Sequence, residues 1–248
     1  PVVAVEDALG RLGVFRDELV GGGRAPEHRI DPHRAHALLL HRARHQHELV
    51  VVDLGVLVTA AAGKGIGFAA AKKCIEEGAR VMISDIHERR LAEAAENLEK
   101  LTGDRVPSRL CNVAKEEDVR GLIEAAISEF GQLDVLINNA GLGGTANVVD
   151  MTDEQWHTVL DITLTGTFRM TRAVLPQMME RKSGVIVNNA SVLGWRAQVG
   201  QAHYAAAKAG VMALTRCSAL DLAPHGIRVN AVSPSLAMHP FLEKVTSP

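Results

Sequence analysis

The stretch VVVDLGVLVTAAAGKGIGFAAAKKC, residues 50–74, decides the fold. Its apolar, β-branched start predicts a buried strand over 50–59, and the alanine-rich pattern that follows predicts a helix over 66–77. Glycines between them let the backbone turn sharply and approach a pyrophosphate, whose charge the free N–H groups of the helix N-terminus stabilise. A strand, a glycine-rich turn and a helix in this order predict a dinucleotide-binding turn. The turn residues expected to contact the dinucleotide are Gly63, Gly65, Ile66 and Gly67.

The same alternation of strand and helix patterns continues along the rest of the chain. Strands are expected at 50–59, 79–85, 105–111, 133–139, 184–190 and 227–233. Helices are expected at 66–77, 87–101, 115–130, 152–181 and 201–223. Strands this apolar are buried on both faces, which is typical of parallel sheets, and the crossovers between parallel strands are right-handed. The sequence therefore predicts an α/β fold: a single Rossmann-type, doubly wound parallel sheet flanked by helices in three layers.

Composition and charge exclude several classes of protein. The chain has 248 residues, 47% of them hydrophobic, which is enough for one ordinary α/β domain. A net charge of −2 argues against a nucleic-acid partner. No apolar run is long enough to span a membrane, and no signal-peptide pattern opens the chain. The three cysteines are widely spaced and form no metal-binding pattern, which favours a cytoplasmic protein with reduced thiols and no metal site.

The first 49 residues differ from the rest because they lack regular periodicity. They include a histidine-rich stretch between His28 and His47. A histidine cluster can bind metal, but no carboxylate or cysteine stands at a ligand spacing here, so a loosely attached extension is the favoured interpretation. Two parts are therefore expected: an irregular N-terminal extension over 1–49 and the Rossmann domain over 50–248.

An acidic residue follows the glycine turn at the spacing typical of dinucleotide-binding folds. Asp85 comes 18 residues after Gly67, at the end of the second predicted strand. A carboxylate there can accept hydrogen bonds from both ribose hydroxyls and would repel a 2′-phosphate, so NAD is favoured over NADP. Asp85 could instead cap a helix. Lys64, within the turn, argues the other way, because a cation there could pair with a 2′-phosphate, so NADP stays possible.

Three residues near the fifth predicted strand form a candidate catalytic group. Tyr204 and Lys208 are spaced i, i+4 and share one helix face. We expect the ammonium to lower the pKa of the phenol, which would let the tyrosine give or take a proton. Ser191 ends the strand at the sheet edge where ligands bind, and its hydroxyl can hydrogen-bond a substrate oxygen. The serine could instead be a simple turn residue.

Further motifs complete a family resemblance. The fourth predicted strand ends in Asn-Asn-Ala-Gly at 138–141, and the last one ends in Asn-Ala-Val-Ser-Pro at 230–234. With the glycine turn and the candidate catalytic group, they make residues 50–248 resemble the short-chain dehydrogenase/reductase (SDR) family. The resemblance implies catalytic roles for the serine, tyrosine and lysine just named. The cofactor contacts expected in all are Gly63, Gly65, Ile66, Gly67, Asp85, Asn112, Val113, Asn139, Ala140, Gly141, Tyr204, Lys208 and Pro234.

The sequence departs from the family pattern at several points. Ala60 stands where the family has the first glycine of the turn, and Asn112 where it usually has an aspartate beside adenine. Thr163 stands at the place of an asparagine that helps to hold a water chain behind the lysine. Only fourteen residues follow Pro234, whereas the family continues through a substrate lid and a last strand. Either the chain is incomplete or these elements are lost.

These features predict an NAD(P)-dependent oxidoreductase that moves a hydride between nicotinamide and a ketone or secondary alcohol. Residues 188–197 resemble actinobacterial members that act on rings in steroid and acyl-CoA breakdown. Trp195 suits an apolar ring and Arg196 a CoA phosphate or carboxylate, although an interface aromatic and a surface cation fit equally well. The alternatives are a catalytically impaired, cofactor-binding sensor or scaffold and a structural subunit without cofactor.

The long predicted helices 152–181 and 201–223 carry apolar residues on more than one face. One face must cover the sheet, and the surplus can pack against a second subunit. A homodimer or homotetramer acting on a small molecule is therefore expected.

Overall fold

The computed structural model describes residues 54–63 and 65–235. The predicted extension over 1–49, with its histidine-rich stretch, and the predicted role of Lys64 lie outside the described residues. The same holds for residues 236–248, so the predicted domain boundary and the missing lid stay predictions.

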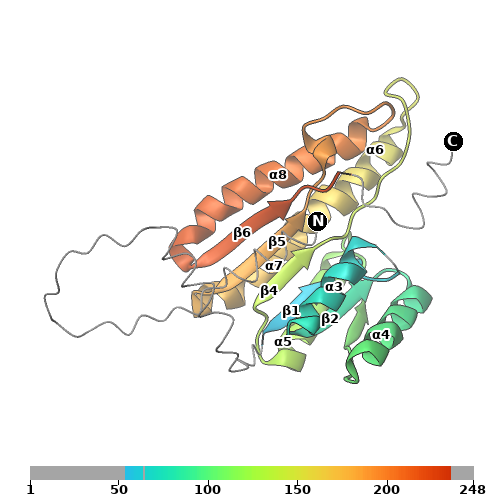
Figure 1. The fold of residues 1–248 in the computed structure, drawn as a ribbon. Helices are drawn as coiled ribbons and strands as arrows, with labels where there is room; N and C mark the ends of the chain where they lie inside the picture. The colour runs from blue at the N-terminus through green and yellow to red at the C-terminus, as the bar shows by residue number, and fades with distance from the viewer. Residues whose placement is uncertain (1–53, 64, 236–248) are drawn as a thin grey trace, which may run out of the picture. The chain divides into compact units, whose positions relative to one another are not determined.

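Six parallel strands form one sheet in the order β3-β2-β1-β4-β5-β6 (Figure 1). They are β1 (Gly55–Val58), β2 (Arg80–Asp85), β3 (Ser108–Leu110), β4 (Val135–Asn138), β5 (Gly184–Asn189) and β6 (Ile227–Val232). Each lies within a predicted strand, and most are buried on both faces, as the continuous apolar runs require. The strand order reverses between β1 and β4. This confirms the predicted Rossmann-type sheet.

Helices fill the crossovers between the strands. They are α3 (Ile66–Glu76), α4 (Glu88–Thr102), α5 (Glu116–Phe130), α6 (Asp153–Leu160), α7 (Gly166–Arg181) and α8 (Ala202–Leu222). A capping box begins α6: Thr152 Oγ1 accepts from the N–H of Gln155, and Gln155 Oε1 accepts from the N–H of Thr152.

The prediction of a single helix over 152–181 was wrong in one respect. Between α6 and α7 the backbone widens into a π-helical segment, Asp161–Thr165. Such segments often lie at functional sites, and this one contains the buried Thr163. Hydrophobic periodicity does not reveal the segment, because one wide turn displaces the pattern by a single residue.

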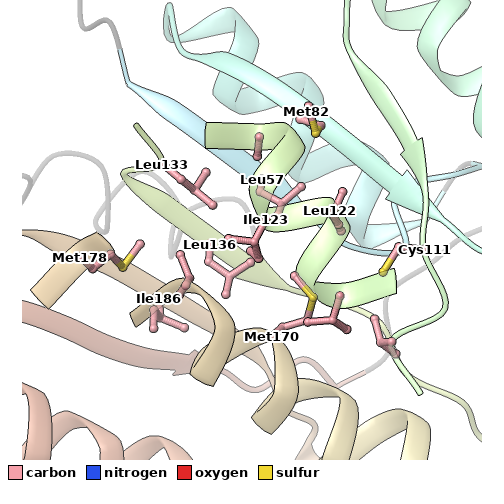
Figure 2. Close-up of a cluster of buried hydrophobic side chains, with 14 of the residues drawn as sticks. Leu57, Met82, Cys111, Leu122, Ile123, Leu133, Leu136, Met170, Met178 and Ile186 are labelled. Carbon is pink, nitrogen blue, oxygen red and sulfur yellow. The ribbon is translucent and has the colours of Figure 1, made fainter. Parts of the chain in front are cut away.

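The largest apolar cluster lies between the sheet and two helices. Figure 2 shows it: α5 contributes Leu122 and Ile123, α7 contributes Met170 and Met178, and strands β1, β4 and β5 contribute the residues beneath them. Those strand residues are Leu57, Leu136 and Ile186. Alternate strand residues such as Val56 and Val58 point to the other sheet face. Right-handed crossovers place α3 and α4 on that face.

A ladder of buried polar groups crosses β4 and β5. Asn138 Nδ2 donates to Thr171 Oγ1 on α7 at 3.2 Å and to Asn188 Oδ1 on β5 at 2.9 Å. Asn188 Nδ2 in turn donates to Thr215 Oγ1 on α8 at 2.9 Å. The ladder therefore joins two strands and two helices through the interior.

Several expected absences can be examined only in the described part of the chain. There, no helix is long and apolar enough to cross a membrane, and no group of His, Cys, Asp or Glu is arranged to hold a metal ion. Cys74 and Cys111 are buried free thiols, and Cys217 is exposed. Phe168 on α7 and Leu220 on α8 are exposed apolar residues of the kind that a second subunit covers. The homodimer or homotetramer stays a prediction.

Candidate active site

The carboxyl ends of β1, β4 and β5 meet where the strand order reverses. In open α/β sheets, ligands bind outside these strand ends, beside such a reversal. The glycine turn follows β1, the Asn-Asn-Ala-Gly motif closes β4, and Ser191 follows β5. Three of the predicted motifs, distant in sequence, therefore share one edge of the sheet.

The glycine turn has the space and the free donors that an anion needs. Added Cβ atoms at Gly63 (φ +97°) and Gly65 would meet nothing within 4 Å, so both positions face open space. Gly65 caps α3 without a side-chain hydrogen bond, and Ile66 begins the helix. The first N–H groups of α3 thus remain available for a phosphate.

Gly67 has a different role, because it is packed tightly. A Cβ there would lie 2.5 Å from Ala60 O and 2.6 Å from Asn139 Nδ2, closer than real contacts allow. Ala60 itself has φ +50°, in the left-handed region that favours glycine. The replacement of the family's glycine by Ala60 therefore holds the turn in the same region at a steric cost of about 1 kcal/mol.

Thr59 fastens the end of β1 to the end of β4. Its buried hydroxyl accepts from the N–H groups of Asn139 (2.9 Å) and Ala140 (3.0 Å). Thr59 is not among the predicted site residues, because its place at the end of the first predicted strand is the one feature of the sequence that points to it.

Asp85 ends β2 beside the glycine turn. Its Oδ2 accepts from the N–H of Ala62 at 3.3 Å and its Oδ1 from the N–H of His87 at 3.0 Å. Burial raises the pKa of the carboxyl above its usual value, and the Ala62 hydrogen bond partly offsets this. Asp85 does not cap α4, because His87 occupies the N-cap position. Each carboxylate oxygen keeps a lone pair for a further donor.

Asn112 and Val113 follow β3, on the same side of the sheet as Asp85. Asn112 Oδ1 accepts from the N–H of Ala114 at 3.0 Å. Among the described residues its Nδ2 donates to no partner, so the amide can bind a ring nitrogen. Val113 is buried against Gly166, where a Cβ would lie 2.7 Å from Val113 Cγ2.

A continuous series of contacts links the glycine turn to the predicted catalytic lysine. Asn139 Nδ2 donates to Ala60 O at 3.0 Å, and Asn139 Oδ1 accepts from Asn189 Nδ2 at 2.8 Å. Lys208 Nζ then donates to the backbone oxygen of Asn189 at 2.5 Å. These contacts therefore link the glycine turn, through β4 and β5, to the helix that carries Lys208.

The structure brings Ser191, Tyr204 and Lys208 together. The Ser191 side chain lies close enough to Tyr204 to lower the pKa of its phenol, and Lys208 Nζ lies 5.6 Å from the centre of the tyrosine ring. Lys208 is 3% exposed, and this burial lowers the pKa of its ammonium to about 8. Its only hydrogen bond among the described residues is the one to Asn189.

The prediction that the pKa of Tyr204 is lowered was wrong. Burial raises the pKa of Tyr204 above its ordinary value, and the Ser191 hydrogen bond offsets only part of the rise. The reason is that desolvation penalises the phenolate more than its neighbours stabilise it. Tyr204 is therefore held as the neutral phenol, the form that donates a proton.

Thr163 fixes the chain that leaves β4. Its fully buried hydroxyl accepts from the N–H of Leu142 at 2.9 Å and donates to the carbonyl of Leu142 at 3.1 Å. The adjacent Gly141 lies between Lys208 and Thr163, since a Cβ there would be 3.5 Å from Lys208 Nζ and 3.7 Å from Thr163 Oγ1. The hydroxyl proton of Thr163 is thus already used.

A groove of about 680 Å³ lies along the segments that follow Ser191 and Tyr204, and none of Ser191, Tyr204 and Lys208 lines it. Its walls come from the segment after Ser191, from the first turns of α8 and from residues 146–148. Trp195, 65% exposed, and Arg196 line it. Pro234 stands behind the segment, because its carbonyl accepts from the N–H of Val192 at 3.0 Å.

These residues fit a nicotinamide dinucleotide. The open glycine turn and the free α3 N-terminus suit a pyrophosphate, and the carboxylate of Asp85 suits ribose hydroxyls. Farther along the edge, the ammonium of Lys208 has unused donors beside Tyr204. Along the sheet edge, Asp85, the glycine turn and Lys208 lie in the same order as the first ribose, the pyrophosphate and the second ribose of such a cofactor.

Comparison with known proteins agrees with this geometry. The model of the family described as short chain dehydrogenase matches residues 55–247. A Mycobacterium tuberculosis protein named (5R,7aS)-5-hydroxy-7a-methyl-1-oxo-2,3,5,6,7,7a-hexahydro-1H-indene-carboxyl-CoA reductase is 58% identical over 193 residues. The match covers 77% of this chain and 74% of that protein.

Two similar crystal structures contain different nicotinamide cofactors. NAD⁺-bound xylitol dehydrogenase is 38% identical with a TM-score of 0.72, over 75% of this chain and 72% of that one. A variant of actinorhodin polyketide ketoreductase with NADPH is 37% identical with a TM-score of 0.74, over 78% of this chain and 74% of that one.

Proposed function

We propose, from the premise that the chain belongs to the short-chain dehydrogenase family, that it reduces a ring ketone to a secondary alcohol. Membership makes it an NAD(P)-dependent oxidoreductase. The observation that carries the proposal is that Ser191, Tyr204 and the buried Lys208 meet at the carboxyl end of β5.

Tyr204 is proposed as the proton donor. Its phenol is neutral near physiological pH, since its ordinary pKa is already about 10 and burial raises the pKa further. It can therefore protonate the oxygen of a carbonyl during reduction. Ser191 would donate a second hydrogen bond to that oxygen and stabilise the charge that develops there. The bound cofactor supplies the hydride that the carbonyl carbon receives. In the reverse direction the phenolate would accept the proton of the alcohol.

Lys208 is proposed to hold the cofactor's ribose and to stabilise the phenolate left after proton donation. Two of its three N–H donors are unused by the described residues, which leaves them for ribose hydroxyls. Its depressed pKa shows how little solvent it contacts, so a charge nearby acts on it strongly.

We propose NAD as the preferred cofactor. The support is Asp85, whose carboxylate lies beside the glycine turn and would repel a 2′-phosphate. The opposing residue, Lys64, lies outside the described part of the chain.

The proposed substrate is a fused-ring ketone that carries a CoA thioester or carboxylate. Two observations support it: the similar mycobacterial reductase, whose name describes a methyl-indene carboxyl-CoA compound, and the groove with Trp195 and Arg196 beside Ser191. An exposed indole suits an alicyclic ring, and a guanidinium suits phosphate or carboxylate.

The experiment is turnover of NADH and NADPH with a panel of ring ketones, for the parent chain and for Tyr204→Phe. We expect Tyr204→Phe to lose at least about 10³-fold in turnover, because the proton donor is removed, while cofactor affinity by fluorescence stays nearly constant. Unchanged turnover would remove Tyr204 from the acid role. Cofactor binding by the parent without any turnover would favour the sensor or scaffold instead.

A further inference from the structure

The segment Gly143–Ala146, which we name the glycine segment, is held by the residues just before α8. Gln201, the N-cap of α8, donates from Nε2 to Gly144 O at 2.7 Å and to Thr145 Oγ1 at 3.3 Å. The N–H of Ala146 donates to Gly200 O at 3.0 Å. A short run at the start of the catalytic helix therefore holds the segment through three hydrogen bonds.

Residues of the first turn of α8 pack against the same segment. A Cβ at Gly144 would lie 3.2 Å from His203 Nε2, and a Cβ at Gly143 would lie 3.8 Å from Tyr204 Cδ2. His203 is only 2% exposed, and its Nδ1 is buried without a hydrogen-bond partner among the described residues. The glycine segment thus lies directly over the tyrosine proposed as proton donor.

The glycine segment also leads from the catalytic group to the groove. At one end, Thr163 fixes Leu142. At the other end, Ala146 and the two residues after it line the groove. Glycine-rich backbone loses much conformational freedom when it is fixed, so its position depends on the hydrogen bonds that hold it. Gln201 supplies two of the three that hold the segment.

We propose that Gln201 is a positioning residue, which sets the glycine segment as the wall against which the larger part of a ring ketone rests while its carbonyl meets Tyr204. The inference rests on the proposed function, because it assigns a residue to that same site. Gln201 acts through the carbonyl of Gly144. A substrate that reaches past the carbonyl carbon touches the wall, and a small one does not.

The test is Gln201→Glu, assayed with 2-decalone and cyclohexanone under saturating NADH. A carboxylate of nearly the same shape cannot donate to Gly144 O and would repel it. We expect kcat/KM for 2-decalone to fall about tenfold, mostly through KM, which is the effect of one lost hydrogen bond. For cyclohexanone we expect a fall of less than about threefold, since one hydrogen bond remote from a small substrate contributes little. Gln201→Met loses the donor without adding charge. It should lower kcat/KM for each ketone in the same direction as Gln201→Glu does.

The matched control is Gln155→Glu. Gln155 is exposed, does not line the groove, and its Oε1 accepts from the N–H of Thr152. A carboxylate can accept the same hydrogen bond, so the control adds the same charge without releasing Gly144. We expect the parent's ratio of kcat/KM values for the two ketones.

The outcomes separate this inference from the proposed function. If the parent reduces both ketones and Gln201→Glu behaves like Gln155→Glu, Gln201 is not a positioning residue. If the parent reduces neither ketone, the proposed function fails. Amide exchange of residues 142–147 then tests whether Gln201 holds the glycine segment, and it is expected to be about tenfold faster in Gln201→Glu than in Gln155→Glu. Equal exchange rates would overturn it.

Discussion

The cofactor half, β1–β3 with α3 and α4, and the catalytic half, β4–β6 with α6–α8, differ in how they use buried polar groups. In the cofactor half, both oxygens of the buried Asp85 accept backbone hydrogen bonds, and the other expected contacts are the glycine turn and the only partly buried Asn112. In the catalytic half, Lys208 uses one of its donors and His203 Nδ1 has no partner among the described residues.

The difference teaches what each half supplies. A dinucleotide has a fixed shape, so a rigid backbone with open glycines can recognise it. Proton transfer needs groups whose hydrogen-bonding capacity is not already spent, and keeping such groups buried costs stability. Changes in the catalytic half should therefore affect pH-dependent behaviour, and changes in the cofactor half should affect packing and cofactor affinity.

The largest expected effect concerns the buried charge of Lys208. Its pKa is about 8 in the folded protein, against an ordinary 10.5. Between these values the unfolded chain binds more protons, so this group makes the protein more stable as the pH rises. The unfavourable contribution is fully present below about pH 8 and is relieved toward pH 10.5. Relative to Lys208→Met, the parent should gain about 3 kcal/mol in unfolding free energy between pH 7 and 11, measured by urea denaturation.

The control for that measurement is Lys100→Met, which removes a lysine exposed on α4. We expect its unfolding free energy to follow the parent across the same pH range within about 0.5 kcal/mol. A pH dependence of Lys208→Met that matches the parent would show that the ammonium is not desolvated.

The second expected effect contrasts two glycines of the turn. Gly67→Ala forces a Cβ onto Ala60 O and Asn139 Nδ2, and should lower the unfolding free energy by about 2 kcal/mol. Gly65→Ala meets open space, so stability should change by less than about 0.5 kcal/mol while NADH affinity falls. Thermal unfolding and NADH fluorescence measure the two. Equal losses of stability would show that the turn does not have separate packing and binding positions.

The smallest expected effect is on cofactor choice. Asp85→Ala removes the carboxylate that we propose disfavours a 2′-phosphate, and the ratio of NADH to NADPH affinity should fall about tenfold, or about 1.4 kcal/mol. Titration of cofactor fluorescence gives both dissociation constants. Equal weakening of the two cofactors would show that Asp85 does not contact the ribose.

The fold was predictable because its signals are local. Apolar runs and strand–helix alternation place each strand within its expected range, and the right-handed crossover rule then fixes the sheet. The edge strand β3 (Ser108–Leu110) is only three residues long, against 105–111 predicted, because Pro107 before it has no backbone N–H to extend the pairing.

The site was predictable only in part. Tyr204 and Lys208 follow from helical spacing, and Ser191 from its place at a strand end. Gln201 could not be found in this way, because its role depends on a segment 57 residues away that only the tertiary fold brings close. The pKa of Tyr204 was also mispredicted, since spacing reveals the nearby ammonium but not the burial that outweighs it.

The ladder of Asn138, Asn188, Thr171 and Thr215 has a consequence for how the sheet assembles. Asn188 pairs opposite Asn138, and its amide spans from β4 to α8. A slip of β5 by two residues would keep every side chain on its own face. It would also leave these amides and hydroxyls buried without hydrogen-bond partners, at a cost of roughly 1–3 kcal/mol for each group. The apolar strands around them tolerate such a slip. The hydrogen bonds of the two amides therefore fix the register between β4 and β5, although these residues lie about 50 positions apart in the chain.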